Sequence, residues 1–337
     1  MDDATIHRPG SPIRDVRIVG TGAHVPDRVV SNDEVGRPAG VDDAWITRKT
    51  AIRERRWAAA HEATSDLATA AARAAMRAAG ITAEQLSVIA VATSTPDRPQ
   101  PPTAAYVQQN LGASGTAAFD VNAVCSGTVF ALSAVGSVIL RRGGYALVIG
   151  ADIYSRILDP ADRRTVPLFG DGAGALVLAP ATSGPVVRHV ALHSFGRLSG
   201  LIQVPAGGSR QPLDQAGLDA GAQYFAMEGR EVRRFVVEQL PQLTKEFLHE
   251  AGVEGADISH FVPHQANGVM LDEVFAELPL PRATMHRTVD RLGNTGAASI
   301  PITLDAAARA GSFTPGELVL LAGFGGGMAA SFALVQW

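Results

Sequence analysis

The feature that most constrains the fold is an internal repeat. Residues 78–93 ("AAGITAEQLSVIAVAT") align with residues 250–265 ("EAGVEGADISHFVPHQ"), and both have the pattern of a helix end, a glycine, a turn and a buried strand. Residues 169–178 ("FGDGAGALVL") match 324–333 ("FGGGMAASFA") in the same order along the chain. Chance similarity between two α/β units is the alternative, but two ordered matches favour a duplication.

Short apolar runs alternate with alanine-rich helical patterns along the whole chain. The runs that predict buried strands are 16–22, 87–93, 117–121, 145–151, 174–180, 186–194, 258–264, 317–325 and 330–336, and the helical patterns are 64–79, 126–142, 228–251 and 299–310. This alternation predicts an α/β protein with helices covering its sheets. We expect a tail at 1–13, a first half at 14–180 and a second half at 181–337, with a site between the halves.

Composition limits the functional classes. The 337 residues are 46% hydrophobic and 18% charged, with a formal net charge of −4, which argues against bulk nucleic-acid binding. A single cysteine excludes an intramolecular disulfide, and the histidines have no zinc-ligand spacing. No secretion signal is evident, and no apolar stretch approaches the roughly 20 residues that span a membrane. We therefore expect a soluble cytoplasmic protein.

The one cysteine, Cys125, follows a predicted strand and opens a predicted helix in "AVCSGTVFALS". A helix N-terminus favours the thiolate, the form that attacks a thioester. A free cysteine is also among the most buried residue types, so an inert core residue is the alternative.

Three features of the second half point to the same chemistry. His264 ends a predicted strand in "VPHQAN", where open α/β sheets present ligand residues, and Asn294 lies in the glycine-flanked turn of "GNTGAAS". Glycines 325–327 follow another strand and could direct backbone N–H groups at an oxyanion. A structural histidine, an ordinary asparagine turn and a plain glycine turn are the alternatives for each feature taken alone.

Together these motifs resemble β-ketoacyl-acyl-carrier-protein synthase III, a family of the thiolase superfamily. The resemblance runs from about residue 16 to the C-terminus and includes "DAWITRKTAIRER" (43–55) and "DPADRRTVPLFGDGAGA" (159–175). It implies a thiolase-like, five-layered α-β-α-β-α fold built from two duplicated halves with mixed sheets. It also implies a homodimer.

The resemblance implies a two-stage reaction. Cys125 takes an acyl group from acyl-CoA, with the backbone N–H groups of Cys125 and Gly326 stabilising the oxyanion. A malonyl unit on acyl carrier protein (ACP) or CoA then loses carbon dioxide while His264 and Asn294 donate hydrogen bonds to its thioester carbonyl. The carbanion attacks the acyl-enzyme and gives a 3-oxoacyl thioester for fatty-acid or polyketide priming. No metal and no redox cofactor are implied.

The resemblance transfers substrate contacts to five further positions. Trp45, Lys49, Arg163 and Asn267 match residues that contact CoA or its pantetheine arm, and Phe169 matches a wall of the acyl pocket. Lys49 replaces the usual arginine and "TAI" replaces "TGI", which puts nucleotide affinity in doubt because lysine lacks the planar stacking of arginine. Trp45 as a core residue and Arg163 as a surface charge are the alternatives.

One departure bears on the acyl acceptor. The helix after "HQAN" commonly carries the basic residues that receive the acidic carrier protein, but residues 268–282 here hold Asp272, Glu273 and Glu277 and no base before Arg282. The cluster "REVRR" (230–234) could compensate. Two alternatives remain: an acyltransferase that passes the Cys125 acyl group to a hydroxyl or amine, and an inactive homologue that binds a partner synthase. Acyl-chain length depends on 98–106 and 192–213, which we expect to be irregular.

Overall fold

The computed structural model describes residues 16–181 and 184–337, so the expected tail at 1–13 lies outside the described residues. Hydrogen bonds connect ten strands in the order β12-β11-β13-β14-β8-β1-β7-β6-β4-β5. These strands are β1 (Val16–His24), β4 (Leu86–Ala92), β5 (Ala117–Val121), β6 (Tyr145–Asp152), β7 (Gly172–Pro180), β8 (Val186–Ser194), β11 (Ile258–Pro263), β12 (Thr284–Met285), β13 (Leu318–Gly325) and β14 (Ala329–Gln336).

The strand order repeats between the two halves. In each group of five, the third strand along the chain lies at one edge, followed in space by the second, fourth, fifth and first. Parallel and antiparallel pairs occur in both groups, as expected for mixed sheets. The groups meet where β1 pairs with β8, through Val16 opposite Val187 and Arg17 opposite Val186. The proposed boundary near residue 180 falls between β7 and β8.

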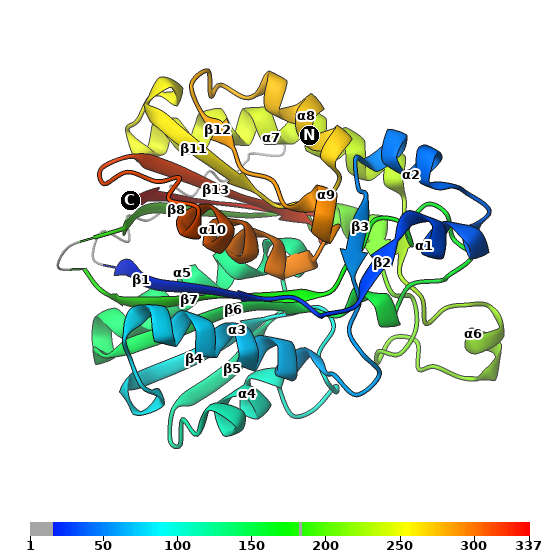
Figure 1. Cartoon of the computed structure of the whole chain (residues 1–337), viewed down its shortest axis with the longest axis horizontal. Coiled ribbons are helices and arrows are strands. Elements are labelled where there is room, and N and C mark those ends of the chain that lie inside the picture. Colours follow the sequence, from blue (N-terminus) through cyan, green and yellow to red (C-terminus); the bar gives the residue numbers. More distant parts are fainter. Residues whose placement is uncertain (1–15, 182–183) are drawn as a thin grey trace, which may run out of the picture.

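Helices complete the layers (Figure 1). α3 (Thr64–Ala79) and α4 (Thr103–Leu111) cover the outer face of the first group of strands, and α7 (Gly229–Ala251) and α8 (Gly268–Glu277) cover the outer face of the second. α5 (Gly127–Arg142) and α10 (Ser299–Arg309) lie between the two groups and contact strands of both. This is the expected five-layered α-β-α-β-α arrangement.

Glycines in the strands let the central helices approach closely. A Cβ atom at Gly150 would lie 2.3 Å from the Ala297 carbonyl oxygen, and one at Gly174 would lie 2.6 Å from the Ile302 backbone nitrogen. A Cβ atom at either position would therefore force backbone atoms apart. The 35 glycines of the chain are used in part for this packing of helix on strand.

The expectation about apolar segments was wrong on length and composition. The helical stretch Val124–Arg142 has 19 residues and a mean hydropathy of 1.6, enough to cross a membrane by those two measures. Within the fold, 56% of this stretch is buried, and Val129, Leu132 and Val135 contribute to a core that includes strands of both halves. The stretch contains the central helix α5, which is apolar because sheets cover both of its faces.

The smaller elements gather at one end of the molecule, beside the site (Figure 1). They are β2 (Val29–Ser31), α1 (Asn32–Ala39), α2 (Asp43–Thr50), β3 (Glu54–Arg56), β9 (Ile202–Gln203), α6 (Gln215–Asp219), β10 (Ala226–Met227) and α9 (Val289–Leu292). The expectation of irregular structure at 98–106 and 192–213 was partly wrong. Helix α4 begins at Thr103, a 3₁₀ turn spans Gly196–Leu201, and β9 follows at Ile202–Gln203, whereas β8 ends at Ser194 as expected for the run 186–194.

Candidate active site

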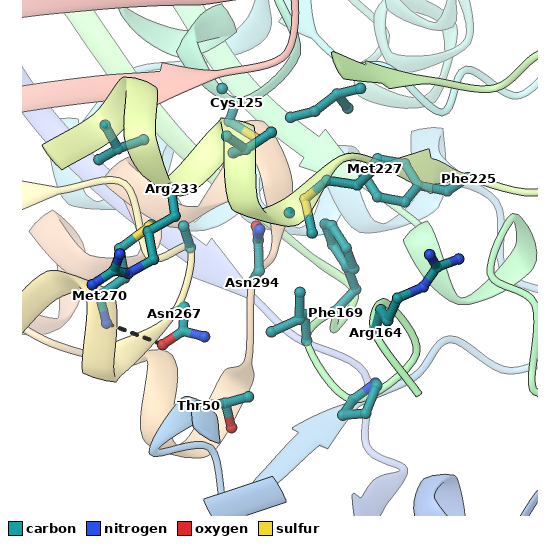
Figure 2. A pocket seen from close by; sticks show the side chains of 18 of the residues that line it. Thr50, Cys125, Arg164, Phe169, Phe225, Met227, Arg233, Asn267, Met270 and Asn294 are labelled. Carbon is teal, nitrogen blue, oxygen red and sulfur yellow. Dashed lines mark hydrogen bonds between the residues drawn. The ribbon is translucent and has the colours of Figure 1, made fainter. Parts of the chain in front are cut away.

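A cavity of about 260 Å³ brings the three expected catalytic residues together. Cys125 comes from the first half, and His264 and Asn294 come from the second. Figure 2 shows Cys125 and Asn294 at the inner end of this cavity, with Asn267 and Arg233 on one side and Phe225 and Arg164 on the other. The cavity therefore lies between the halves, as the repeat predicted.

Cys125 sits on a tight turn between β5 and α5. A 3₁₀ turn over Val124–Ser126 leads into the helix, and Val124 has a φ of +47°, a strained value for a β-branched residue. The Cys125 side chain is 6% exposed, and a Cβ atom at Gly325 would lie only 2.7 Å from its Cβ. The turn thus brings the sulfur to the cavity wall formed by the "GFGGG" loop.

The electrostatics around Cys125 oppose the expected thiolate. Burial raises the pKa of the thiol well above its usual range, and the nearby Asp152 carboxylate raises it further. A hydrogen bond with Tyr154 and one with the backbone N–H of Cys125 itself lower the pKa, but by less than burial raises it. The net effect of these contacts is a pKa for the Cys125 thiol above its usual range, with burial as the largest cause.

His264 is held at the end of β11. Its backbone N–H donates to the Ala322 carbonyl at 2.7 Å, and its ring packs edge-on against Phe324 with centroids 5.2 Å apart. Nδ1 lies 2.7 Å from the Ser299 hydroxyl. Burial lowers the pKa of His264 to about 3, so the ring is neutral at physiological pH. A neutral imidazole donates from one nitrogen only.

Asn294 is fixed by its own backbone and by its amide oxygen. Its N–H donates to the Leu168 carbonyl at 2.8 Å, and its carbonyl accepts from the Gly170 N–H at 3.0 Å. Its Oδ1 accepts from the Gly296 N–H at 2.9 Å, which leaves the Nδ2 amide as the donor for the cavity that Asn294 lines. Gly296 has a φ of +58°, a conformation that favours glycine.

A buried carboxylate that sequence reasoning missed ties the two halves together at the site. Asp152, at the end of β6, accepts through Oδ2 from the Ala297 N–H at 2.8 Å and through Oδ1 from the Ser94 N–H at 2.8 Å. Burial is the main cause that raises its pKa. Asp152 thereby anchors the turn that follows Asn294 to the first half of the chain.

Three aromatic rings form one wall of the cavity. Phe169, the expected wall residue, stacks on Tyr154 with centroids 4.4 Å apart and meets Phe225 edge-on at 4.9 Å. All three residues line the cavity and are buried. Sequence reasoning missed Tyr154 and Phe225 because neither lies in a motif, and Phe225 follows an irregular segment with no periodic pattern.

The expected CoA contacts line the mouth of the same cavity. They are Trp45, Lys49, Arg163 and Asn267, joined by Arg164 and Arg233, which sequence reasoning did not assign to the site. Local structure positions two of them. Asp42 caps α2 by accepting from the Trp45 N–H at 2.8 Å, and Asn267 caps α8 by accepting from the Val269 N–H at 2.9 Å.

The neighbouring glycines Gly325 and Gly326 of the "GFGGG" loop line different pockets. Gly325 lines the main cavity, whereas Gly326 lines a neighbouring pocket and packs against Val124 and Ile202. Of the two, Gly325 is the residue beside the nucleophile, because a Cβ atom there would lie 3.1 Å from the Cys125 sulfur. Among the described residues, no group of three His, Cys, Asp or Glu side chains is arranged to hold a metal ion.

Comparison with known proteins identifies the family. Residues 119–196 match the model for 3-oxoacyl-[acyl-carrier-protein] synthase III, and residues 248–337 match the model for its C-terminal part. The β-ketoacyl-[acyl-carrier-protein] synthase III of Erythrobacter litoralis is 44% identical over 95% of this chain and 98% of that protein. The chain belongs to the synthase III family. The acetoacetyl CoA synthase NphT7 of Streptomyces sp. (strain CL190) is 80% identical over 95% of this chain and 98% of its own.

Solved structures of synthase III enzymes have the same fold. The Aquifex aeolicus enzyme superimposes with a TM-score of 0.85 at 34% identity, covering 96% of this chain and all (100%) of its own. Another 3-oxoacyl-(acyl-carrier-protein) synthase III superimposes with a TM-score of 0.90 at 30% identity over 96% of this chain and 100% of its own. As a synthase III, the protein is an acyl-transferring condensing enzyme, primed by an acyl-CoA and extended by a malonyl unit. This confirms the reaction class expected from the sequence.

Proposed function

We propose that this synthase III condenses acetyl-CoA with malonyl-CoA to give acetoacetyl-CoA. The observation that carries the proposal is the site itself: Cys125, His264 and Asn294 meet in one cavity that ends in an aromatic wall and opens at a basic mouth. The name of the 80% identical relative, an acetoacetyl CoA synthase, agrees with this choice of starter and acceptor.

In the first stage, the Cys125 sulfur attacks the acetyl-CoA carbonyl carbon. The S–H bond of Cys125 breaks as the new carbon–sulfur bond forms, the bond from the carbonyl carbon to the CoA sulfur breaks, and the released proton passes through solvent to the departing CoA thiolate. The N–H groups of Cys125 and Gly326 stabilise the tetrahedral oxyanion. The acetyl group then remains on Cys125 as a thioester.

In the second stage, the malonyl thioester carbonyl receives hydrogen bonds from His264 Nε2 and Asn294 Nδ2. These donors stabilise the enolate that forms as the carbon–carbon bond to the carboxylate breaks and carbon dioxide leaves. The enolate carbon attacks the acetyl carbonyl, the bond to Cys125 breaks, and the 3-oxoacyl thioester departs. A neutral His264 suits this step, because a ring with a pKa of about 3 stays uncharged and donates throughout.

The cavity mouth supports a CoA-borne acceptor. Lys49 and Arg163 supply positive charge there for the phosphates of CoA, whereas Arg164 is paired with Asp162 at 2.9 Å. On α8, Asp272 pairs with Arg287 and Glu273 pairs with Arg233, so the arginine of the 230–234 cluster that faces this helix is already neutralised. The same pairs neutralise Asp272 and Glu273, so Glu277 is the α8 carboxylate left to repel an acidic carrier protein, and no basic side chain on α8 attracts one.

The aromatic wall supports a short starter. Tyr154, Phe169 and Phe225 contact one another and are 1–6% exposed, so a long acyl chain on Cys125 would have to displace at least one ring. An acetyl group extends only one methyl beyond the thioester. We therefore assign acetyl-CoA as the starter and these three rings as the limit on chain length.

Strand β5 supports a homodimer. It lies at the edge of the ten-stranded order, so one side of its backbone has no partner strand among the described residues, and Phe119 and Val121 are only partly buried there. A second copy pairing at β5 would satisfy that edge. Light scattering should then give a mass of about 70 kDa, twice the 35.1 kDa chain, at micromolar concentration, and a 35 kDa particle would contradict the dimer.

We place the enzyme in the cytoplasm, which fractionation of cells expressing it would test.

The reaction is tested by separating loading from condensation. The protein is incubated with acetyl-CoA, and the mass of the peptide containing Cys125 is read; malonyl-CoA is then added, and the product and carbon dioxide are measured. We expect an acetylated peptide and then acetoacetyl-CoA with one carbon dioxide per product. Cys125→Ser should sharply reduce loading, and His264→Ala should reduce condensation far more than loading. An ester or amide product without carbon dioxide release would instead support the acyltransferase alternative.

The acceptor is tested by comparing malonyl-CoA with malonyl-ACP on the acetylated enzyme. We expect kcat/KM to be at least about tenfold higher for malonyl-CoA, and a preference for malonyl-ACP would overturn the assignment. Glu277→Lys adds a base on α8 and should improve use of malonyl-ACP while leaving malonyl-CoA unchanged. Glu84→Lys makes the same charge change on an exposed 3₁₀ turn before β4 and should affect neither substrate.

A further inference from the structure

The proposed condensation requires the proton of the neutral His264 ring to be on one particular nitrogen. Nδ1 lies 2.7 Å from the Ser299 hydroxyl, so Nε2 is the nitrogen left for the substrate. If Nδ1 carried the proton, Nε2 would be an acceptor and would repel the oxygen of a forming enolate. Something in the structure must therefore favour the tautomer with the proton on Nε2.

Ser299 has the properties needed to select that tautomer. It is the first residue of α10, is 1% exposed, and its hydroxyl makes no other hydrogen bond among the described residues. If His264 Nδ1 donated to Ser299, the serine proton would be buried without an acceptor, which is costly. If Ser299 donates to Nδ1 instead, both groups are satisfied. The buried pair therefore favours the proton on Nε2.

Within the part of the chain that the structure describes, the surroundings of the pair supply no competing hydrogen-bond partner for the ring. The pKa of His264 is lowered by burial alone, with no charged group contributing, and the neighbouring ring is the apolar Phe324. The backbone on either side is fixed separately: the His264 N–H donates to Ala322, and the Gln265 side chain donates to the Pro263 carbonyl at 2.8 Å. The Ser299 hydroxyl is thus the group that sets ring orientation and tautomer.

We infer that Ser299 is a positioning residue that donates to His264 Nδ1 and thereby keeps the Nε2 proton directed at the malonyl thioester carbonyl. This inference rests on the proposed condensation. It adds a residue from the start of α10 to the site, so that the segment from Asn294 to Ser299 controls both hydrogen-bond donors of the second stage.

The inference is tested first on the unmodified enzyme. With ¹⁵N-labelled histidine, the nitrogen shifts of His264, assigned by their loss in His264→Ala, report which ring nitrogen carries the proton. We expect a protonated Nε2 and an unprotonated, hydrogen-bonded Nδ1 between pH 6 and 8. A protonated Nδ1 would overturn the inference, and this measurement needs no variant of Ser299 to fold.

The second test uses Ser299→Ala. We expect a mixture of tautomers and a fall in the condensation rate of about 10- to 100-fold, by analogy with the loss of a group that orients a metal-bound histidine. Acetyl loading of Cys125 should stay within about threefold, because loading does not use His264. Equal losses in loading and condensation, or an unchanged tautomer with unchanged condensation, would contradict the inference.

Thr303→Val is the matched control. It deletes another buried hydroxyl of α10, one that bonds the Thr288 hydroxyl at 2.7 Å and does not touch His264. We expect Thr303→Val to leave the His264 tautomer and the ratio of the loading rate to the condensation rate unchanged, even if the variant is less stable. A shifted His264 tautomer in this variant would count against a specific role for Ser299. If the unmodified enzyme has the expected tautomer but never condenses malonyl-CoA, the proposed function fails while the assignment of the Ser299 hydrogen bond stands.

Discussion

Ala51 occupies a backbone conformation that suits glycine. It caps the C-terminus of α2 with φ 57° and ψ 14°, and it stands where the synthase III pattern has glycine in "TGI". The left-handed region costs a residue with a Cβ about 1–2 kcal/mol, partly offset by the greater freedom of glycine in the unfolded chain. We predict that Ala51→Gly raises the free energy of unfolding by about 1 kcal/mol, measured by denaturant titration.

Ala78→Gly is the matched control for that prediction. Ala78 is exposed near the end of α3 and has helical geometry, so glycine there should lower the free energy of unfolding by about 0.5–1 kcal/mol. The two substitutions make the same chemical change with opposite expected signs. Destabilisation by both would mean that contacts of the Ala51 methyl group, such as that with Gly268, outweigh its backbone strain.

His264 makes stability depend on pH. Its pKa falls from an ordinary 6.5 to about 3 on folding, so the unfolded chain binds more protons between those two values. The resulting stability is fully present above pH 6.5 and is lost as the pH falls from 6.5 towards 3. We predict that the loss of unfolding free energy between pH 7 and pH 5 is about 2 kcal/mol larger in the unmodified enzyme than in His264→Asn.

The comparison with His264→Asn is needed because other histidines contribute. Burial also lowers the pKa values of His189 and His286, so the unmodified enzyme loses stability in acid for several reasons. Subtracting the profile of the variant, measured by thermal or denaturant unfolding, isolates His264. Parallel profiles for the two proteins would mean that His264 is not buried in its neutral form.

At the scale of elements, the packing of α10 against β7 depends on Gly174. A Cβ atom at Gly174 would lie 2.6 Å from the Ile302 nitrogen and 2.8 Å from the Pro301 carbonyl carbon, both backbone atoms of α10. We predict that Gly174→Ala lowers the free energy of unfolding by about 1–3 kcal/mol through overpacking. Because α10 begins at Ser299, condensation should also slow more than loading.

Gly200→Ala serves as the control for this packing. No atom lies within 4 Å of a Cβ built at Gly200, and its φ is outside the positive range, so alanine should be tolerated there. Denaturant titration and the loading and condensation assays are run on both variants. If Gly174→Ala matched Gly200→Ala in stability, the close approach of β7 and α10 would not constrain the fold.

Elements were predictable from sequence where burial imposes a pattern. The nine apolar runs correspond to the nine long strands, with ends shifted by at most two residues, as at β7, expected at 174 and beginning at Gly172. Helices α1, α2 and α4 were not predicted, because they are short and their boundaries depend on caps such as Ser31 and Asp42 rather than on an apolar face. The apolar stretch that contains α5 was underestimated because serine and glycine residues interrupt it, although its apolar side chains pack against strands of both halves.

At the scale of the whole molecule, the site could be predicted only where motifs mark it. Cys125, His264 and Asn294 stand in recognisable strand-end or turn contexts, and the structure brings all three to one cavity. Tyr154 and Ser299 carry no such mark. Their places come from the packing of β6 and α10 against the rest of the fold, which no local pattern records.

Under the proposed function, both substrates reach Cys125 through the mouth of the same cavity, and this sets the order in which they bind. Acetyl-CoA and malonyl-CoA must use the same basic mouth, so CoA has to leave before the second thioester binds. We predict parallel lines in double-reciprocal plots and inhibition by each substrate at high concentration. Lys49→Ala should raise the KM of both thioesters together, by about 3- to 10-fold for the loss of one charge-assisted contact. Intersecting lines, or a change in only one KM, would require a second CoA site and would leave the cavity at Cys125 to a single thioester.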